Sequence, residues 1–568
     1  MQRGNLHTRG RCFPLITKFC DWVLRLGDWG KARRSPAYAL LLLGLLGLDS
    51  GTPLYAATLS PKQRIVPNWS RFEQVFVSTF NYTNPLQELT LTAVFTSPQG
   101  ETRTVQGFWD GGRIWRIRFC PDTPGQWTFS TVCSDARNDG LSAQTGKFLC
   151  TAPIGDSPFQ RHGPIRIARD RRHFEHADRT PFFWIADTVW NGARLASYKD
   201  WQRYASIRFF QAFNVALWSL TPGDDMEYES ALNGFPDRIG INPGFFQRLD
   251  AKLETLSREG ILSAILPVFD RSPGEASKTL PADQAGLFYR YVLARWGSEP
   301  VAWLIEAENK SDTGQKDCWK SVEAVFTNSH APVILIGVDG FGSAEGFRNL
   351  SSVDALGVIA QPDPVIQQNP QPSGPHCPVI VFAPPENGLK PASHARFSAD
   401  EVRRTLYENL LNCDFAGVTY AAQGVAEWDS TIDASSTTEL GRLPVWEKAL
   451  FMPAAKQMRP LANLMSWIEY WRLLPQPGLL VVPTARSHST QDDPVAASTE
   501  NKDLTLIYLP QSNPVEISPT AMPPSPNITW LDPRHGWTRS AAAVVTGQSC
   551  QFPPPANGDW VLMIKSGK

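Results

Sequence analysis

The chain has 568 residues, 42% of them hydrophobic and 19% charged, so it is long enough for several folded domains with sizeable cores. This composition excludes a disordered protein, because disordered chains are poor in apolar residues and carry a high net charge. The 54 Lys and Arg residues nearly balance the 55 Asp and Glu residues, which excludes an electrostatic basis for binding nucleic acid or an anionic membrane.

The N-terminal segment, residues 1–57, is predicted to be an export signal. A basic cluster at 31–34 precedes an apolar run at 37–48, and small residues follow at 56–57. The apolar run has about 12 residues, fewer than the roughly 20 that a membrane-spanning helix needs, which favours a signal over an anchor. We therefore expect an exported protein that is periplasmic, extracellular or held at the cell surface.

Residues 58–152 are predicted to form an Ig-like β-sandwich. Short strand-like runs alternate with turn signals such as Asn84-Pro85 and Gly111-Gly112. These runs are Val75–Thr79, Leu89–Phe95, Ile114–Phe119 and Trp127–Val132. Cys120, Cys133 and Cys150 fall in the same region, where export permits a disulfide, but the sequence does not determine which of the three would pair.

Residues 153–474 are predicted to form a (β/α)₈ TIM barrel, because strand-like runs alternate with amphipathic helical patterns. The strand-like runs are Phe182–Ala186, Val215–Leu220, Leu262–Phe269, Ala302–Ile305, Val333–Gly337, Leu356–Ala360, Val379–Phe382 and Gly417–Ala421. The helical patterns include Lys199–Phe213, Pro243–Glu259, Ala282–Gly297, Asp317–Asn328 and Ala399–Asn412. A doubly wound open sheet is the competing architecture, but no G-x-G-x-x-G or P-loop motif occurs. Residues 475–568 are rich in strand-like runs and proline, which predicts a small C-terminal β-domain.

Carboxylates gather at the predicted carboxyl ends of the barrel strands, where TIM barrels place their catalytic groups. They are Asp187, Asp224, Asp225, Asp270, Glu306, Glu308, Glu386 and Glu427. Glycoside hydrolysis needs one carboxylic acid to protonate the leaving oxygen and a second carboxylate as nucleophile or base. Nearby Trp residues offer faces on which sugars stack. For Asp187, capping of the following helix is the alternative.

Glu308 is the favoured acid because it lies two residues further along the chain than Glu306. The negative charge of Glu306 would raise the pKa of Glu308 and help it to hold a proton near neutral pH. The alternative for Glu308 is a salt bridge to a loop Lys or Arg. No G-x-S-x-G or H-E-x-x-H motif supports an esterase or a zinc protease. His173 and His176 are interpreted as part of a solvated hairpin rather than as metal ligands. Neither a metal nor another cofactor is expected.

Several segments resemble the apiosidase-like glycoside hydrolase family, secreted (β/α)₈ enzymes of bacterial polysaccharide breakdown. The segment 181–190 (PFFWIADTVW) resembles the family's first strand and its Asp-Thr-x-Trp turn. The segment 208–215 (RFFQAFNV) resembles the helix that leads into the second strand, and 443–475 resembles the closing helical region. The resemblance implies a bacterial origin and a glycoside hydrolase barrel.

The flanking regions resemble domains that accompany this barrel. Residues 61–152 resemble the β-sandwich that often precedes it, notably in Gly107-Phe-Trp-Asp-Gly-Gly. The tail resembles a module named for collagen binding, through the segments 530–536 (WLDPRHG) and 552–562. The resemblance covers nearly all of residues 60–568.

The catalytic positions of the family are matched at one strand and altered at another. Glu308 stands where the family places its fourth-strand acid/base. The other carboxylate belongs to a motif like Glu-Pro-x-Tyr-Glu, but here Ala383 stands at the first Glu and one residue is missing before Glu386. Three interpretations stay open: Glu386 supplies the second carboxylate from a shifted loop, Glu427 supplies it, or catalysis is lost.

The sequence thus predicts a secreted glycoside hydrolase that cleaves a plant or microbial polysaccharide by two-carboxylate chemistry, with Glu308 and Glu386 as catalytic residues. The predicted substrate-binding residues are Asp187, Trp190, Asn191, Trp218, Asn309, Glu427 and Trp428. The expected partner is a carbohydrate, with neither nucleic acid nor an obligate protein partner implied. The alternative is a catalytically impaired carbohydrate-binding or cell-surface protein on the same barrel.

Overall fold

The computed structural model describes fourteen segments of the chain. They are residues 63–220, 231–233, 238–267, 280–306, 313–327, 329, 334–338, 353–360, 377–390, 395–413, 415–430, 444–481, 492–546 and 549–567. The predicted export segment and the predicted site residues Glu308 and Asn309 lie outside these residues. No helix within them is long and apolar enough to cross a membrane.

Two sheets form the N-terminal β-sandwich. The first sheet has the order β1 (Ile65–Pro67), β8 (Thr145–Thr151), β7 (Gly125–Cys133), β3 (Leu91–Thr96) and β4 (Thr102–Gln106). The second has the order β2 (Phe72–Val77), β6 (Ile114–Phe119) and β5 (Phe108–Trp109). Phe95 of the first sheet stacks on Phe119 of the second with ring centroids 4.1 Å apart, so aromatic side chains hold the sheets together. Cys120, Cys133 and Cys150 are all free thiols.

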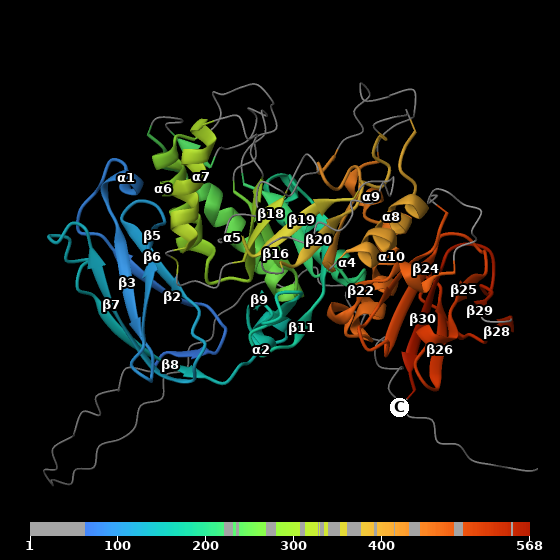
Figure 1. Ribbon diagram of the computed structural model, residues 1–568. Helices are drawn as coiled ribbons and strands as arrows, with labels where there is room; N and C mark the ends of the chain where they lie inside the picture. Colours follow the sequence, from blue (N-terminus) through green and yellow to red (C-terminus); the bar gives the residue numbers. More distant parts are fainter. Residues whose placement is uncertain are drawn as a thin grey trace, which may run out of the picture. The chain divides into compact units, whose positions relative to one another are not determined.

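Eight parallel strands close into a barrel, as predicted (Figure 1). In order around the barrel they are β12 (Trp184–Thr188), β13 (Val215–Ser219), β16 (Leu262–Leu266), β17 (Val301–Glu306), β18 (Leu335–Val338), β19 (Ala355–Ile359), β20 (Val379–Phe382) and β21 (Phe415–Ala421). Each overlaps one of the eight predicted runs, because a barrel strand is buried on both faces and reads as a continuous apolar segment.

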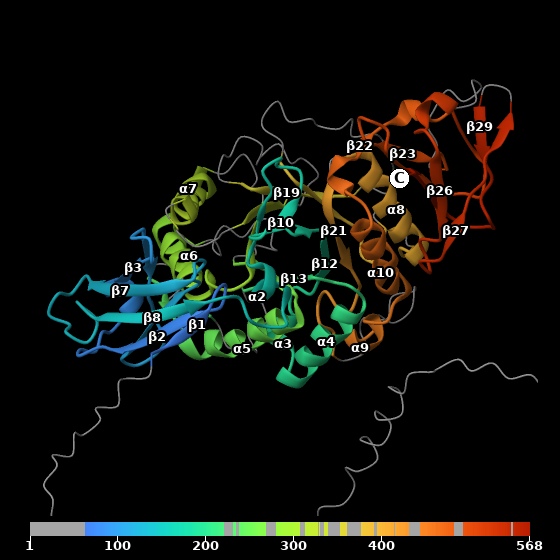
Figure 2. The ribbon, with the colours of Figure 1, turned by 90° about the horizontal axis from the view of Figure 1, so that it is seen from below.

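Helices surround the strands of the barrel (Figures 1 and 2). The longer ones are α4 (Tyr198–Phe210), α5 (Pro243–Glu259), α6 (Ala282–Trp296), α7 (Thr313–Thr327), α8 (Ala399–Asn412) and α10 (Pro453–Ser466). Local signals set several ends: Ser197 caps α4, Ser398 and Glu401 form a capping box at α8, and α5 ends at Gly260 with φ +80°.

The barrel strands separate two apolar clusters. One cluster fills the barrel interior and includes Trp184, Ala186 and Leu217. The other lies between the strands and the helices and includes Ile185 and Trp218. Because successive side chains of a strand point to opposite faces, this division tells which strand residues face the interior and which face the helices.

A small sheet of β9 (Ile165–Ile167), β10 (Phe174–His176) and β11 (Pro181–Phe182) packs on the start of the barrel strands. Its Phe174 and Phe182 belong to the interior cluster, and the Phe174 ring lies 5.6 Å from that of Trp184, the first residue of β12. The interpretation of His173 and His176 as solvated is wrong, because both are buried: His173 stacks on Trp471, and His176 Nδ1 lies 2.7 Å from the Gly163 carbonyl.

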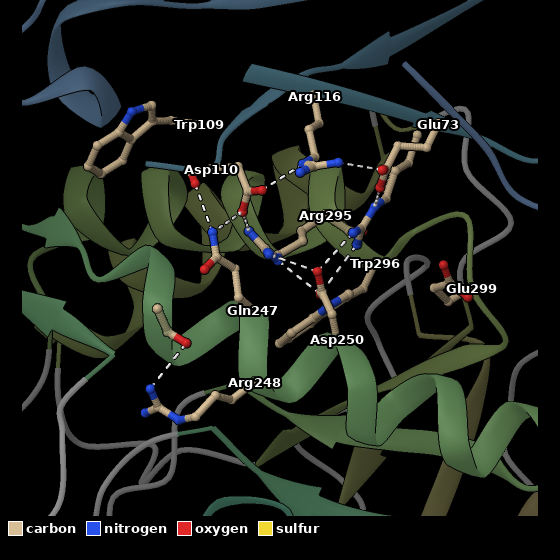
Figure 3. Close-up of polar contacts among 12 residues, drawn as sticks. Glu73, Trp109, Asp110, Arg116, Gln247, Arg248, Asp250, Arg295, Trp296 and Glu299 are labelled. Carbon is tan, nitrogen blue, oxygen red and sulfur yellow. Dashed lines mark hydrogen bonds and ion pairs between the residues drawn. The ribbon is translucent and has the colours of Figure 1, made fainter. Parts of the chain in front are cut away.

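The sandwich is joined to helices α5 and α6 by a network of ion pairs (Figure 3). Arg118 of β6 donates to Glu73 at 2.7 Å and to Asp250 of α5 at 2.8 Å. Arg295 of α6 lies 2.7 Å from the same Asp250 and 2.9 Å from Asp110. The shared carboxylate of Asp250 therefore connects the sandwich to both helices, and removal of one member would leave the others with uncompensated charge.

Two antiparallel sheets form the C-terminal β-domain. The larger has the order β22 (Leu474–Pro475), β23 (Val495–Ser498), β24 (Leu504–Leu509), β30 (Trp560–Ser566), β26 (Pro526–Leu531) and β27 (Thr538–Ser540). The smaller has the order β25 (Val515–Ile517), β29 (Ser549–Phe552) and β28 (Val544–Thr546). Arg403 of α8 makes two hydrogen bonds to Asp559, at 2.7 and 2.8 Å, which attach this domain to the barrel.

Candidate functional site

Asn191 and Glu427 meet at the carboxyl end of the barrel. Asn191 follows β12 and Glu427 follows β21, two strands that pair side by side. The Asn191 side chain donates from Nδ2 to Glu427 Oε2 at 3.0 Å, and Arg194 donates to Asn191 Oδ1 at 2.8 Å. Two predicted substrate-binding residues are thus brought together at the end of the barrel where this fold carries its chemistry.

Trp190 lies at the same end of the barrel, directly before Asn191. Its side chain is half-buried and packs with Phe382 against the interior cluster. Ser219, the last residue of β13, donates its backbone N–H to the Trp190 carbonyl at 3.0 Å, which fixes the turn after β12. Trp190 is therefore a partly exposed aromatic residue at this end of the barrel, next to Asn191 in the chain.

Strand β17 ends at the same edge. Its last residue, Glu306, pairs in register with Val338 of β18. Glu308, the predicted acid/base, lies outside the described residues.

The backbone of Glu386 lies at the carboxyl end of the barrel, where it forms a parallel bridge with Ala422, but its side chain points away from the mouth. Its carboxylate is 4% exposed and accepts hydrogen bonds from Tyr420 Oη at 2.5 Å and from the backbone N–H of Ala454, in the first turn of α10, at 3.2 Å. Tyr420 belongs to the cluster between strands and helices, so Glu386 faces the helix layer. Burial raises the pKa of Glu386, and the hydrogen bond from Tyr420 opposes this shift. This geometry conflicts with the prediction that Glu386 is catalytic: a carboxylate enclosed by protein donors is not available to a sugar.

Asp187 also faces the helix layer. Its side chain is fully buried, and Oδ2 accepts from Tyr204 Oη and from Arg208 Nε, both at 2.8 Å. Burial raises the pKa of Asp187, and the positive charge of Arg208 opposes the shift. The predicted contact of Asp187 with substrate conflicts with this enclosure. Helix capping is not the explanation either, because the partners are side chains of α4.

Two of the predicted aromatic contacts are core residues. Trp218 is 1% exposed and packs on Trp296 of α6, with ring centroids 6.0 Å apart. Trp428 is 4% exposed and stacks on Trp446 at 4.3 Å. Both belong to the cluster between strands and helices, so the prediction that they stack on sugars conflicts with their position. The residue types were suitable, but the strand geometry turns Trp218 outward.

Arg208 is the residue of this layer that the sequence analysis missed. It is fully buried, it binds Asp187, and its Nη1 donates to Gln211 at 2.7 Å and to the Leu450 carbonyl at 3.1 Å. The signal was available: Arg208 falls on the apolar face of α4, one turn after the buried Tyr204. A charged residue on a buried helix face requires a buried partner.

The described residues contain no group of three or more His, Cys, Asp or Glu side chains that could hold a metal ion. The site as described is therefore built from carboxylate, amide and indole groups. This set can bind sugar hydroxyls, stack on a sugar ring and, with a second carboxylate, exchange protons with a glycosidic bond.

Three family models match the chain. "Apiosidase-like, catalytic domain" matches residues 168–472, which is more than half of the chain. A domain of unknown function, DUF5060, matches residues 65–134, and the "Putative collagen-binding domain of a collagenase" matches residues 480–565. The comparison with curated proteins found no match.

Solved structures of glycoside hydrolases share the fold. A structure described as a "putative glycoside hydrolase" from Bacteroides vulgatus has a TM-score of 0.63 and 16% identity, and the match covers 89% of this chain and 100% of that one. A family 5 glycoside hydrolase from the same species has a TM-score of 0.61 and 16% identity, with 73% and 96% covered. A third, described as "Glycoside hydrolase", has a TM-score of 0.60 and 17% identity, with 73% and 99% covered.

Proposed function

Since the chain belongs to the apiosidase-like family of glycoside hydrolases, we propose that it hydrolyses a glycosidic bond in a plant or microbial polysaccharide after export. The observation that carries this proposal is the hydrogen-bonded pair of Asn191 and Glu427 beside Trp190, at the carboxyl ends of adjacent barrel strands. Trp190 stacks on a sugar ring, and Asn191 orients one carboxylate oxygen of Glu427.

In this proposal Glu308 is the general acid/base, two residues beyond the end of β17, and Glu427 is the second carboxylate. Glu308 protonates the leaving oxygen, while Glu427 attacks the anomeric carbon or activates a water. Carboxyl groups about 5 Å apart would give retention, and a separation of about 6.5–9.5 Å would give inversion. Glu427 takes the role because Glu386 is enclosed between β21 and α10.

A second candidate function is carbohydrate binding without hydrolysis. It is favoured by Ala383, which stands where the resemblance implies the seventh-strand carboxylate. The methyl side chain of Ala383 has no acidic group, and it is buried in the cluster between strands and helices. This position therefore cannot supply the second carboxylate.

Release of reducing sugar from a panel of plant and bacterial polysaccharides tests the proposal. We expect the parent to be active, Glu308→Gln and Glu427→Gln each to lose at least about 100-fold in rate, and Glu386→Gln to stay within about threefold. Glu386→Gln is the matched control, because it makes the same chemical change at an enclosed carboxylate.

An active Glu427→Gln variant would reject Glu427 as the second carboxylate. A parent that retains polysaccharides without releasing sugar would establish the second candidate function.

A further inference from the structure

The C-terminal β-domain carries an exposed indole on the turn between β26 and β27. Trp537 is 66% exposed, whereas Trp530 and Trp560 of the same domain are 2% and 6% exposed and fill its core. The imidazole of His535 stacks on the Trp537 ring with centroids 4.8 Å apart and planes inclined by 20°. We call this pair the Trp537–His535 platform.

The turn below the platform is rigid. The buried carboxylate of Asp532 accepts from the Arg534 backbone N–H at 2.8 Å and from Arg534 Nε at 2.9 Å, and it lies 3.0 Å from His535 Nδ1. The Gly536 N–H donates to the Asp532 carbonyl at 2.8 Å, and Gly536 has φ +78°, which permits this tight turn. The turn that carries the indole is therefore held by hydrogen bonds before a ligand arrives, which lowers the conformational entropy cost of binding.

The exposure of Trp537 shows which part of it is open. His535 covers one face of the ring, so a residue that remains 66% exposed must leave its other face in solvent. The open face of such a ring can stack on the apolar C–H face of a ligand, and stacking would remove that ring face from water.

The basic groups of the turn itself, Arg534 and His535, are both occupied by acidic partners. Arg534 is engaged by Asp532 and also stacks over the Trp560 ring at 5.7 Å. His535 contacts the same Asp532 carboxylate. These two basic groups of the turn are therefore partnered by a buried carboxylate and are not free to bind a phosphate or carboxylate ligand.

We propose that the Trp537–His535 platform is a second carbohydrate-binding site, at which Trp537 stacks on the C–H face of a neutral sugar unit in a polysaccharide. The site itself rests on the geometry of the turn, and the choice of a sugar as its ligand rests on the proposed function.

The platform is coupled to the barrel. A Cβ atom on Gly536 would lie 3.6 Å from Pro460 of α10, so the turn abuts that helix. At the end of the same helix, Lys565 Nζ donates to the Trp467 carbonyl at 3.4 Å. A polysaccharide held by the platform stays attached to the catalytic domain, which raises its effective concentration at the barrel.

The test measures retention of the full chain in native gels cast with xylan, arabinan, galactan or mannan, which reports binding without turnover. We expect the parent to be retarded by at least one polymer, Trp537→Ala to bind at least about fivefold more weakly, and Trp537→Tyr to keep part of the affinity. Phe210→Ala is the matched control, because Phe210 of α4 is 69% exposed but belongs to the barrel. Thermal unfolding of each variant verifies that it is folded.

Equal retardation of Trp537→Ala and the parent would overturn the proposal, as would a parent that none of the polymers retards. Retention on fibrillar type I collagen that Trp537→Ala abolishes, without retention by polysaccharides, would also overturn it and assign a protein ligand. If the protein binds a polymer through Trp537 and yet releases no sugar, that result would support the platform and reject hydrolysis. Failure of the platform and failure of the proposed function are therefore distinguishable.

Discussion

Arg208 donates from Nε to Asp187 Oδ2 at 2.8 Å, and the protein encloses both side chains completely. The pair joins helix α4 to the end of strand β12, directly before the turn that carries Trp190 and Asn191. The low exposure makes the pair sensitive to the loss of either partner, because a buried charge without its counterion is strongly destabilising. The position of the mouth residues therefore depends on a contact behind the strand.

We predict that Arg208→Met lowers the free energy of unfolding by about 3–5 kcal/mol, since Asp187 is left buried without its cation. Urea unfolding followed by tryptophan fluorescence measures this loss. Lys199→Met on the exposed side of the same helix is the control and should change stability by no more than about 0.5 kcal/mol. An equal loss of stability in the two variants would show that the buried ion pair contributes no more to stability than a surface cation does.

Glu386→Gln should be tolerated in the folded state. Burial raises the pKa of Glu386, so the protein already disfavours its charged form, and an uncharged amide should cost at most about 1 kcal/mol. Glu386→Ala should cost more, about 1–3 kcal/mol for each donor left unpaired, because Tyr420 and the Ala454 N–H lose their acceptor. Chemical unfolding compares the two variants. A Gln variant that is stable but releases no sugar would return Glu386 to the catalytic site.

Asp250 should make the stability of the protein depend on pH in the acid range. Burial alone would raise its pKa, but Arg118 and Arg295 lower it from 3.8 to about 2. The stabilisation, about 2 kcal/mol, is therefore complete above pH 3.8 and is lost as the pH falls toward 2. Unfolding transitions between pH 6 and 2 should show a smaller acid-induced loss for Asp250→Asn than for the parent.

The matched control for Asp250 is Glu254→Gln, one turn further along α5, where the carboxylate is 46% exposed and pairs with Arg258 at the surface. It should leave the acid dependence nearly unchanged. If the free energy of unfolding fell equally with pH in the parent and in Asp250→Asn, the ion pairs of Asp250 with Arg118 and Arg295 would not be the source of the acid dependence.

Lys252 should make the stability depend on pH in the alkaline range, with the same sign as Asp250. Its Nζ donates to the carbonyls of Ala193 and Ala196 at 2.6 Å each, and burial lowers its pKa from 10.5 to about 8. The folded protein thus releases a proton that the unfolded chain holds, and the free energy of unfolding rises as the pH increases from about 8 to 10.5. The difference in stability between the parent and Lys252→Met should grow over this interval, as thermal unfolding can measure. A difference that is constant with pH would contradict the lowered pKa.

The sequence alone determined the order and kind of the elements. Helices α5 and α8 begin and end where the sequence predicts, because a proline, a capping serine and a left-handed glycine mark their ends locally. All eight barrel strands were recognisable for a similar reason, since short apolar runs between amphipathic helices permit few other arrangements. The meeting of Asn191 and Glu427 followed from their places after the first and last strands.

Only the tertiary structure decided which strand-end side chains face the mouth. Asp187, Trp218, Glu386 and Trp428 have suitable residue types at suitable strand ends, yet all four face the helices. In a strand buried on both faces the alternation of apolar and polar residues disappears, so the sequence carries no signal for its orientation. That orientation is fixed by closure of the barrel and by partners distant in sequence, such as Arg208 for Asp187 and Ala454 for Glu386.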